Sequence, residues 1–380
     1  MATPNSSNPP PFVALRLRPE MSRGRRYPEL SHPYRTEFQR DRDRVIHARA
    51  FRRLENKTQV FPSGFSDHFR NRLTHTIEVA QIARTVAATL GLDEDLTETL
   101  ALVHDVGHPP FAHAGEEELR RQMQRFGETF DHNLHALRIV ESFEARYARF
   151  PGLNLTFEVR EGIVKHSRDL VPGESEELEG YLPELRPPLE AQIIDLADEV
   201  AYNTADLDDA YSASMFSIDE IRDAVPAFSD IWEAIEMQFP GAEERVQFLE
   251  TLRQVINLLV SGLLDGTAVA IGASGVETVD DVRRHPDRLV RLTPAAAETS
   301  RELKRFLHRK VYQSAALFDA RNRSVRMIAE LFQYYEAAPD RLPQPYRDQA
   351  HESTPHRVIC AYIAGMTDGY CSRVYADLIG

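Results

Sequence analysis

Histidine and carboxylate side chains are concentrated in one short stretch, "LVHDVGHPPFAHAGEEEL", which covers residues 102–119. Its His104 and Asp105 are followed by Gly107 and by a pair of prolines, residue types that end or redirect helices. Imidazole and carboxylate groups bind divalent metal ions, and imidazole also transfers protons near neutral pH. The stretch therefore predicts a reactive site at which helix ends converge.

Two further residues complete a candidate metal site. His75 lies early in "NRLTHTIEVAQIAR", an expected helix, and Asp198 lies in "IIDLADEVAY", where most neighbours are apolar. A carboxylate in apolar surroundings has to be paired, hydrogen-bonded or metal-bound, because burying the charge alone is too costly. His75, His104, Asp105 and Asp198 form a nitrogen and oxygen ligand set that suits Mn²⁺, Fe²⁺, Zn²⁺, Co²⁺ or Ni²⁺. A single His-Asp pair is more often a surface or helix-end pair, so the prediction depends on the whole set.

A candidate acid–base pair follows the prolines. His113 and Glu116 are three residues apart at the start of the next expected helix, so they share one face of it. A histidine that is oriented by a carboxylate can donate or accept a proton near neutral pH. The alternative is that the acids of this turn only stabilise the positive end of the helix, which is our interpretation of Glu117 and Glu118.

The elements that position these residues are expected to be helices. Apolar residues recur at three- and four-residue spacings in five segments, with glycine and proline between them, and these segments are 75–90, 98–105, 133–147, 190–211 and 245–264. Strand signals are few, and "TQVFPS" is the best of them. We expect an all-α fold with at most a minor short β-hairpin. A flexible arm is expected over 1–34 and a single unit over 35–380, with the metal-site core at about 69–210 and a C-terminal helical part at about 211–380.

Composition limits the classes of function. The net charge of −14 argues against general nucleic-acid binding, which needs a basic surface. Only two cysteines occur, which fits a reducing compartment, and the N-terminal residues lack the pattern of a secretory signal. No apolar run approaches the roughly 20 residues that span a bilayer. We therefore expect a cytoplasmic protein without a membrane segment.

The spacing of His75, the His104-Asp105 pair and Asp198 resembles that of HD-domain phosphohydrolases. More narrowly, the chain is similar to the bacterial deoxyguanosine-triphosphate triphosphohydrolase-like proteins. The blocks "FRRLENKTQVF", "HDVGHPPFAHAGE" and "YIAGMTD" carry this resemblance, and similar blocks run in order from about residue 40 to residue 370. The resemblance implies hydrolysis of a dNTP between the α-phosphorus and O5′, which yields a deoxynucleoside and inorganic triphosphate. It also implies one divalent ion per site, with Mn²⁺ or Mg²⁺ expected first.

The resemblance assigns roles to the residues around the metal. It implies that His113 and Glu116 act in catalysis and that His108 and His132 lie along the phosphates, with His108 counted among the catalytic residues. The remaining substrate-binding residues would contact the phosphates (Arg72 and Lys304), the sugar 3′-hydroxyl (Gln59) and the rest of the sugar (Tyr202, Asp206 and Tyr312). Tyr312 would leave no room for a 2′-hydroxyl. From the residues alone, the tyrosines are equally core residues, and His132 is equally a packed helix-start residue.

Three positions depart from the family pattern, namely Ala205, Ala361 and Gly369. They leave base preference and subunit contacts open. The family further implies a homo-oligomer, a hexamer or a tetramer, and an allosteric dNTP between subunits. Two alternatives remain: another HD-type phosphohydrolase, such as a nucleotidase or a cyclic-nucleotide phosphodiesterase, or a non-catalytic dNTP sensor.

Overall fold

The computed structural model describes residues 11–61, 68–352 and 354–380. Throughout these residues the regular structure is helical and no strand occurs, so the all-α prediction is confirmed. Two isolated β-bridges are present, between Arg25 and Thr156 and between Thr58 and Asn71. The expected strand "TQVFPS" thus contributes one bridge at Thr58, and its last two residues lie outside the described ranges.

The chain divides into two compact units, and each is built from three separate segments. The first unit comprises 1–43, 77–102 and 155–306, and the second comprises 44–76, 103–154 and 307–380. The single unit expected over 35–380 stays a prediction. All or most of each following helix lies in the first unit: η1 (Val13–Leu15), η2 (Pro19–Met21), α1 (Glu37–His47), α3 (Arg72–Leu90), α4 (Glu94–Val103), α7 (Phe157–Val164), α8 (Glu176–Glu179), α9 (Leu189–Ser212), α10 (Ile218–Ala224), α11 (Pro226–Gln238), α12 (Glu244–Ser274), α13 (Val279–Arg284) and α14 (Pro294–Leu307).

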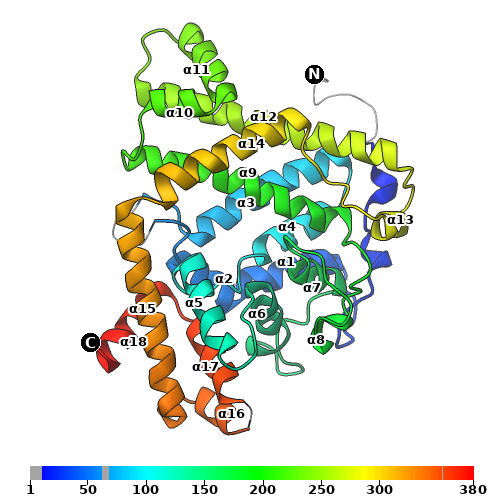
Figure 1. The fold of residues 1–380 in the computed structure, drawn as a ribbon. Helices are drawn as coiled ribbons and strands as arrows, with labels where there is room; N and C mark the ends of the chain where they lie inside the picture. The colour runs from blue at the N-terminus through cyan, green and yellow to red at the C-terminus, as the bar shows by residue number, and fades with distance from the viewer. Residues whose placement is uncertain (1–10, 62–67, 353) are drawn as a thin grey trace. The chain divides into compact units, whose positions relative to one another are not determined.

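The second unit contains shorter helices around one long one. Its elements are α2 (Arg49–Arg53), η3 (Leu54–Asn56), α5 (Ala112–Gln124), α6 (His132–Arg138), η4 (Ile139–Phe143), η5 (His308–Tyr312), α15 (Ala315–Ala337), η6 (Pro339–Arg341), α16 (Tyr346–Glu352), α17 (Pro355–Ala364) and α18 (Asp368–Leu378). Helices α5 and α17 pack on α15 (Figure 1). Their apolar faces meet in a core that includes Leu119, Phe332 and Ile363, which are completely buried. This core supports the start of α5, where the candidate catalytic residues lie.

In the first unit, α9 and α12 lie side by side (Figure 1). Both helices were expected from their apolar periodicity, and both form. Local signals define other helices as well: Ser217 and Glu220 form a capping box at the start of α10, with each side chain accepting a hydrogen bond from the main chain of the other.

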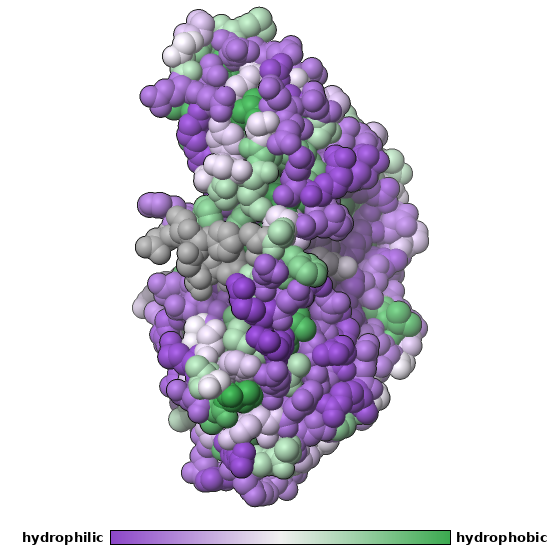
Figure 2. All heavy atoms as spheres, turned by 60° about the vertical axis from the view of Figure 1, so that its left-hand side comes forward, coloured by the Kyte–Doolittle hydropathy of each residue, from purple (hydrophilic) through white to green (hydrophobic). Residues whose placement is uncertain are grey.

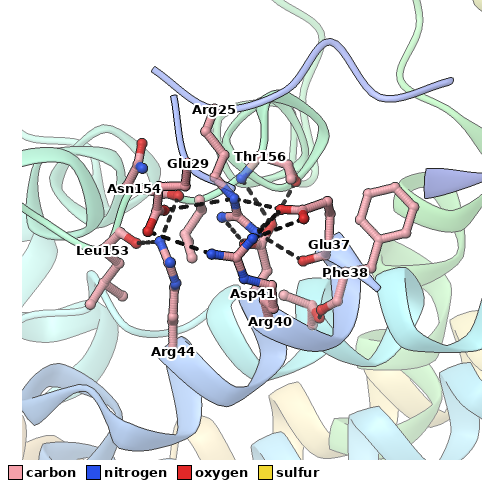
Figure 3. Close-up of polar contacts among 12 residues, drawn as sticks. Arg25, Glu29, Glu37, Phe38, Arg40, Asp41, Arg44, Leu153, Asn154 and Thr156 are labelled. Carbon is pink, nitrogen blue, oxygen red and sulfur yellow. Dashed lines mark hydrogen bonds and ion pairs between the residues drawn. The ribbon is translucent and has the colours of Figure 1, made fainter. Parts of the chain in front are cut away.

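Part of the described N-terminal segment packs within the first unit, and the flexible arm expected over 1–34 stays a prediction. Leu15 and Leu17 are buried. Arg25 forms ion pairs with Glu37 and Asp41 (Figure 3). Thr156 donates to Asp41 from its main chain at 2.8 Å and from its hydroxyl at 2.6 Å. Composition suggested a loose segment because it does not reveal these long-range partners.

Other arginines of this region also pair with acids, as the sequence suggested. Arg42 lies 2.8 Å from Asp95 and 3.1 Å from Glu98. In the second unit, Arg44 donates instead to the carbonyls of Leu153 and Asn154 (Figure 3). These contacts account for much of the basic composition without an anion site.

One buried acid in the first unit predicts a pH-dependent stability. Glu190 is completely buried and accepts hydrogen bonds from the main chain of Leu17 and Asp93. Burial raises the pKa of Glu190 to about 7. Because the folded-state pKa lies above the ordinary value, the stabilisation is complete below pH about 4.5 and is lost as pH rises through about 7. The free energy of unfolding of Glu190→Gln, relative to that of wild type, should therefore increase by about 2–3 kcal/mol as pH rises between these values.

Thermal unfolding of both proteins at pH 5 and pH 8 measures this gain. Glu176→Gln is the control, because Glu176 is exposed in the same unit. An equal difference between Glu190→Gln and wild type at the two pH values would contradict the prediction.

Helix α12 corrects one expectation about the sequence. By length and composition it is apolar enough to cross a membrane, with a mean hydropathy of 1.7 over its best window, of which 33% is buried. The apolar residues of α12 do not form a continuous run in the sequence, because Asp265 and several small polar residues interrupt them. A single helix of this kind is weak evidence, because core helices of soluble proteins share these properties. The face drawn in Figure 2 is mostly hydrophilic, with hydrophobic side chains in small separate groups.

Candidate active site

The His-Asp pair lies in a tight turn directly after α4. The helix ends at Val103, and residues 104–107 form the turn. The side chains of His104 and Asp105 are buried. His75, in the first turn of α3, is also buried, and its ring lies edge-on to that of His104 with 6.0 Å between centroids. The second unit therefore brings two of the predicted metal ligands together.

Asp105 is surrounded by positively charged and imidazole groups. One carboxylate oxygen accepts a hydrogen bond from Arg72 at 2.6 Å, and the other lies 3.0 Å from Nδ1 of His108 and 3.5 Å from Nε2 of His104. Burial would raise the pKa of Asp105, but Arg72 and the two histidines outweigh it and hold the pKa well below its ordinary value. Burial and Arg72 also lower the pKa of His108. Asp105 is thus an ionised carboxylate, which is the form that a metal ion needs.

These donors fit a divalent metal ion. Two buried imidazoles with an ionised carboxylate nearby are the ligand types that Mn²⁺, Fe²⁺ and Zn²⁺ accept. The fourth predicted ligand, Asp198, lies in α9 of the first unit. Its Oδ2 is 4.0 Å from Nε2 of His166, and Nδ1 of that histidine is 2.8 Å from Asp195. The ligand roles of all four residues, and the identity of the ion, stay predictions.

Glu116 is the centre of a second cluster. It is buried in α5, and its Oε1 lies 2.9 Å from Nδ1 of His132 and 3.1 Å from Arg120. Nδ1 of His113 is farther away, at 3.9 Å, and 86% of the His113 side chain is exposed. Burial would raise the pKa of Glu116, but the nearby His113 and the hydrogen-bonded His132 hold it well below its ordinary value. The structure therefore places two histidines on one ionised carboxylate, with His132 nearer than the expected partner.

His108 joins the two clusters. Its ring lies 3.9 Å from that of His132 between centroids, and its Nδ1 faces Asp105. His108, Glu116 and His132 each place a nitrogen or oxygen within 4.8 Å of the others. Arg72 and Arg120 adjoin these groups and pair with Asp105 and Glu116, respectively.

Local backbone geometry explains the glycines and prolines in the stretch. A side chain at Gly107 would place its Cβ 2.0 Å from the carbonyl oxygen of His132, and one at Gly115 would place it 1.9 Å from that of Pro110. Only glycine permits these close approaches. Between them, Phe111 has the left-handed backbone conformation (φ 62°), so the chain reverses sharply before α5 begins. Asp131 then caps α6 by accepting from the amide of Leu134, which sets the start of the helix that carries His132.

The predicted substrate-binding residues are divided between the units. In the first unit, the Nζ of Lys304 lies 2.7 Å from Glu199 and 5.6 Å from the centre of the Tyr202 ring, while Asp206 is buried in the same helix as Tyr202. Lys304 and Tyr202 are therefore neighbours, as expected of residues that contact one ligand. Their roles stay predictions.

In the second unit, Gln59 is half-buried directly after the bridge at Thr58, and Tyr312 is half-buried at the end of η5. Arg72, which was expected to contact a phosphate, is buried against Asp105. The substrate-binding roles of these three residues also stay predictions.

Sequence reasoning missed three buried polar residues near these groups. His166 lies beside Asp198, as described above. Lys57 is buried and donates to the carbonyl of His108, and burial lowers its pKa to about 7. Asp368 is buried at the start of α18. The sequence motifs pointed to two of them, because Lys57 lies in the block "FRRLENKTQVF" and Asp368 lies in the block "YIAGMTD".

Comparisons with known proteins agree with this geometry. The HD domain matches residues 72–203, and the phosphohydrolase-associated domain matches residues 290–377. Among similar curated proteins, each named deoxyguanosinetriphosphate triphosphohydrolase-like protein, one from Geobacter sulfurreducens is 45% identical over 92% of this chain and 90% of its own length. Another, from Caulobacter sp. (strain K31), is 44% identical over 95% and 94%. A third, from Thiobacillus denitrificans, is 43% identical over 96% of each chain. The chain therefore belongs to the deoxyguanosinetriphosphate triphosphohydrolase-like family of metal-dependent HD-domain phosphohydrolases.

Proposed function

We propose that this protein hydrolyses deoxynucleoside triphosphates to a deoxynucleoside and inorganic triphosphate and so contributes to control of the dNTP pool. The observation that carries the proposal is the buried arrangement around Asp105 and Glu116. Two ionised carboxylates lie there among four imidazoles and two arginines, in one unit of the chain. The name of the relatives supports the substrate class.

The chemistry requires charge neutralisation and a proton for the leaving O5′. A divalent ion held by His75, His104, Asp105 and Asp198 supplies Lewis-acid polarisation of a phosphate oxygen when it is bound. Arg72 keeps Asp105 ionised and adds positive charge where a phosphate would bind.

A histidine beside Glu116 supplies the proton for the leaving O5′. Because Glu116 faces Nδ1 of His132, the Nε2 of that ring is left for the phosphates. His113 is more exposed, and its Nδ1 lies 3.9 Å from Glu116. We assign His113 as the proton donor to O5′ and His132, with His108, as the groups that hold the phosphates.

The other residues select the sugar and the outer phosphates. Lys304 neutralises the outer phosphates, with its ammonium group over the Tyr202 ring. Gln59 binds the 3′-hydroxyl, Asp206 contacts the sugar, and Tyr312 excludes a 2′-hydroxyl.

A product assay tests the proposal. We expect purified protein with Mn²⁺ or Mg²⁺ to convert at least one dNTP, supplied singly or in a mixture, to deoxynucleoside and tripolyphosphate. The matching ribonucleotides should not react, and EDTA should abolish the reaction until the metal ion is restored. Anion-exchange chromatography separates the products. Release of only pyrophosphate or orthophosphate would contradict the proposal, and turnover of mononucleotides or cyclic nucleotides instead would favour the alternative enzyme class.

Assembly and regulation belong to the same proposal. We propose a homo-oligomer, a hexamer or a tetramer, with an allosteric dNTP between subunits, located in the cytoplasm. Turnover that appears only in mixtures of dNTPs would support the allosteric nucleotide, and light scattering with and without dNTPs measures the assembly.

A further inference from the structure

We infer that Asp368 is a positioning residue, which holds two active-site segments in register through their main-chain N–H groups. The inference rests on the proposed function, because it concerns the same site. Asp368 is the first residue of α18 and is 5% exposed. One of its oxygens accepts from the amide of Thr58 at 2.8 Å, and the other accepts from the amide of Phe111 at 2.9 Å. One buried carboxylate thus joins two loops that lie far apart in the sequence.

The first loop leads to the start of α3. Thr58 precedes Gln59 and forms an isolated bridge with Asn71, and the amide of Arg72 donates to the carbonyl of Lys57 at 3.1 Å. Fixing the amide of Thr58 therefore helps to fix the adjacent Gln59 and, through the amide of Arg72, the start of α3. A displacement here moves the predicted contact to the sugar and the partner of Asp105 together.

The second loop carries the catalytic histidines. Phe111 and Ala112 both have the left-handed backbone conformation, with φ of 62° and 56°. Such conformations cost free energy for residues with a side chain and persist only where other contacts impose them. Helix α5 has no side-chain cap of its own at Phe111, and Asp368 supplies an acceptor to the Phe111 amide from a distant part of the chain. The turn between His108 and His113 is therefore stabilised by a residue that lies outside the turn, Asp368.

Lys57 strengthens the same connection. It is 3% exposed, and its ammonium group donates to the carbonyl of His108 and, at 3.4 Å, to that of Ala364. The carbonyl oxygen of Gly365 accepts from Arg53 at 3.1 Å. The end of α17 and the start of α18 thus contact both loops through side chains of opposite charge. The hydrogen bonds of Lys57 and Asp368 go to main-chain groups, so their contribution is to position other segments.

The test replaces Asp368 with asparagine, which keeps the shape but turns one acceptor into a donor that faces an N–H group. Loss of a charge-assisted hydrogen bond should speed amide exchange at that site by roughly tenfold to a hundredfold. We expect this increase in peptides that contain Thr58 and Phe111, measured by hydrogen–deuterium exchange with mass spectrometry. We also expect kcat for the dNTP to fall at least roughly tenfold, with a smaller change in KM and with metal content unchanged.

Two controls separate positioning from general stability. Asp377→Asn changes the same charge on an exposed residue of the same helix and should match wild type in every measurement. A peptide that contains Ile328, in the core of the second unit, should exchange at the wild-type rate in both variants. If Asp368→Asn does not fold, Asp368→Glu keeps the charge but moves both oxygens by one methylene, and the same measurements apply.

The outcomes distinguish this inference from the proposed function. Unchanged exchange at Thr58 and Phe111, equal acceleration in the Ile328 peptide, or faster exchange with unchanged kcat would each overturn the positioning role. If the wild-type protein hydrolyses no dNTP, the proposed function fails. Amide exchange then still tests the contacts of Asp368, with kcat measured on whichever phosphoester the protein does hydrolyse.

Discussion

Asp105→Asn is expected to lower kcat for dNTP hydrolysis by roughly a hundredfold or more. The carboxylate accepts from Arg72 at 2.6 Å and lies within 3.5 Å of two histidines, so its charge organises the buried cluster. Asparagine preserves the volume but removes the charge, which weakens metal binding and leaves the guanidinium of Arg72 without a counterion. Because Arg72 is 2% exposed, the variant should also lose about 3 kcal/mol of stability.

Three measurements check this result: kcat with saturating metal ion, metal content by elemental analysis, and thermal unfolding. Asp340→Asn is the matched control, because the Asp340 side chain is 79% exposed in the second unit and its loss removes only a surface ion pair. If Asp105→Asn retained full hydrolysis, the activity would belong to a contaminant, and a dNTP sensor would become the better interpretation of the protein.

Glu116→Gln is expected to lower kcat by roughly 100- to 10,000-fold while the protein stays folded and keeps its metal ion. The Glu116 pKa is held well below its ordinary value, so the group is ionised at every pH at which the protein is assayed. Glutamine cannot supply that negative charge to His113 and His132, which lie beside it.

The neighbouring acid provides the control. Glu117→Gln makes the same chemical change one residue away, but the Glu117 side chain is 65% exposed and pairs only with Arg321 on the surface. Full activity of Glu117→Gln beside inactive Glu116→Gln would assign the effect to the buried carboxylate. Equal losses in the two variants would instead indicate a general effect of negative charge in α5, and the catalytic role of Glu116 would be wrong.

The positions of His113 and His132 beside Glu116 show which contacts can be predicted from the sequence and which cannot. The pair His113–Glu116 is recognisable because residues three apart share a helix face. His132 comes from α6, sixteen positions beyond Glu116, and no local spacing indicates that it lies closer to the carboxylate. The tertiary fold, through the close approach of Gly107 to α6, brings them together.

The helices were more predictable than the contacts between them. Apolar periodicity identifies α9 well, because a helix with one buried side needs that pattern in its own sequence. The packing of residues 11–34 and the contacts of Asp368 depend on buried acids that accept from main-chain N–H groups. Every residue except proline offers such a donor, so the partner's identity leaves no pattern in the sequence.

The two hydrogen bonds of Asp368 also have a consequence for biosynthesis. They join residues that are 310 and 257 positions apart in the chain. A ribosome that has synthesised the protein as far as α17 has already made every predicted metal ligand and both carboxylate clusters. It has not yet made the residue that holds the two loops together. We therefore expect a nascent chain to reach its full hydrolytic activity only after α18 has emerged.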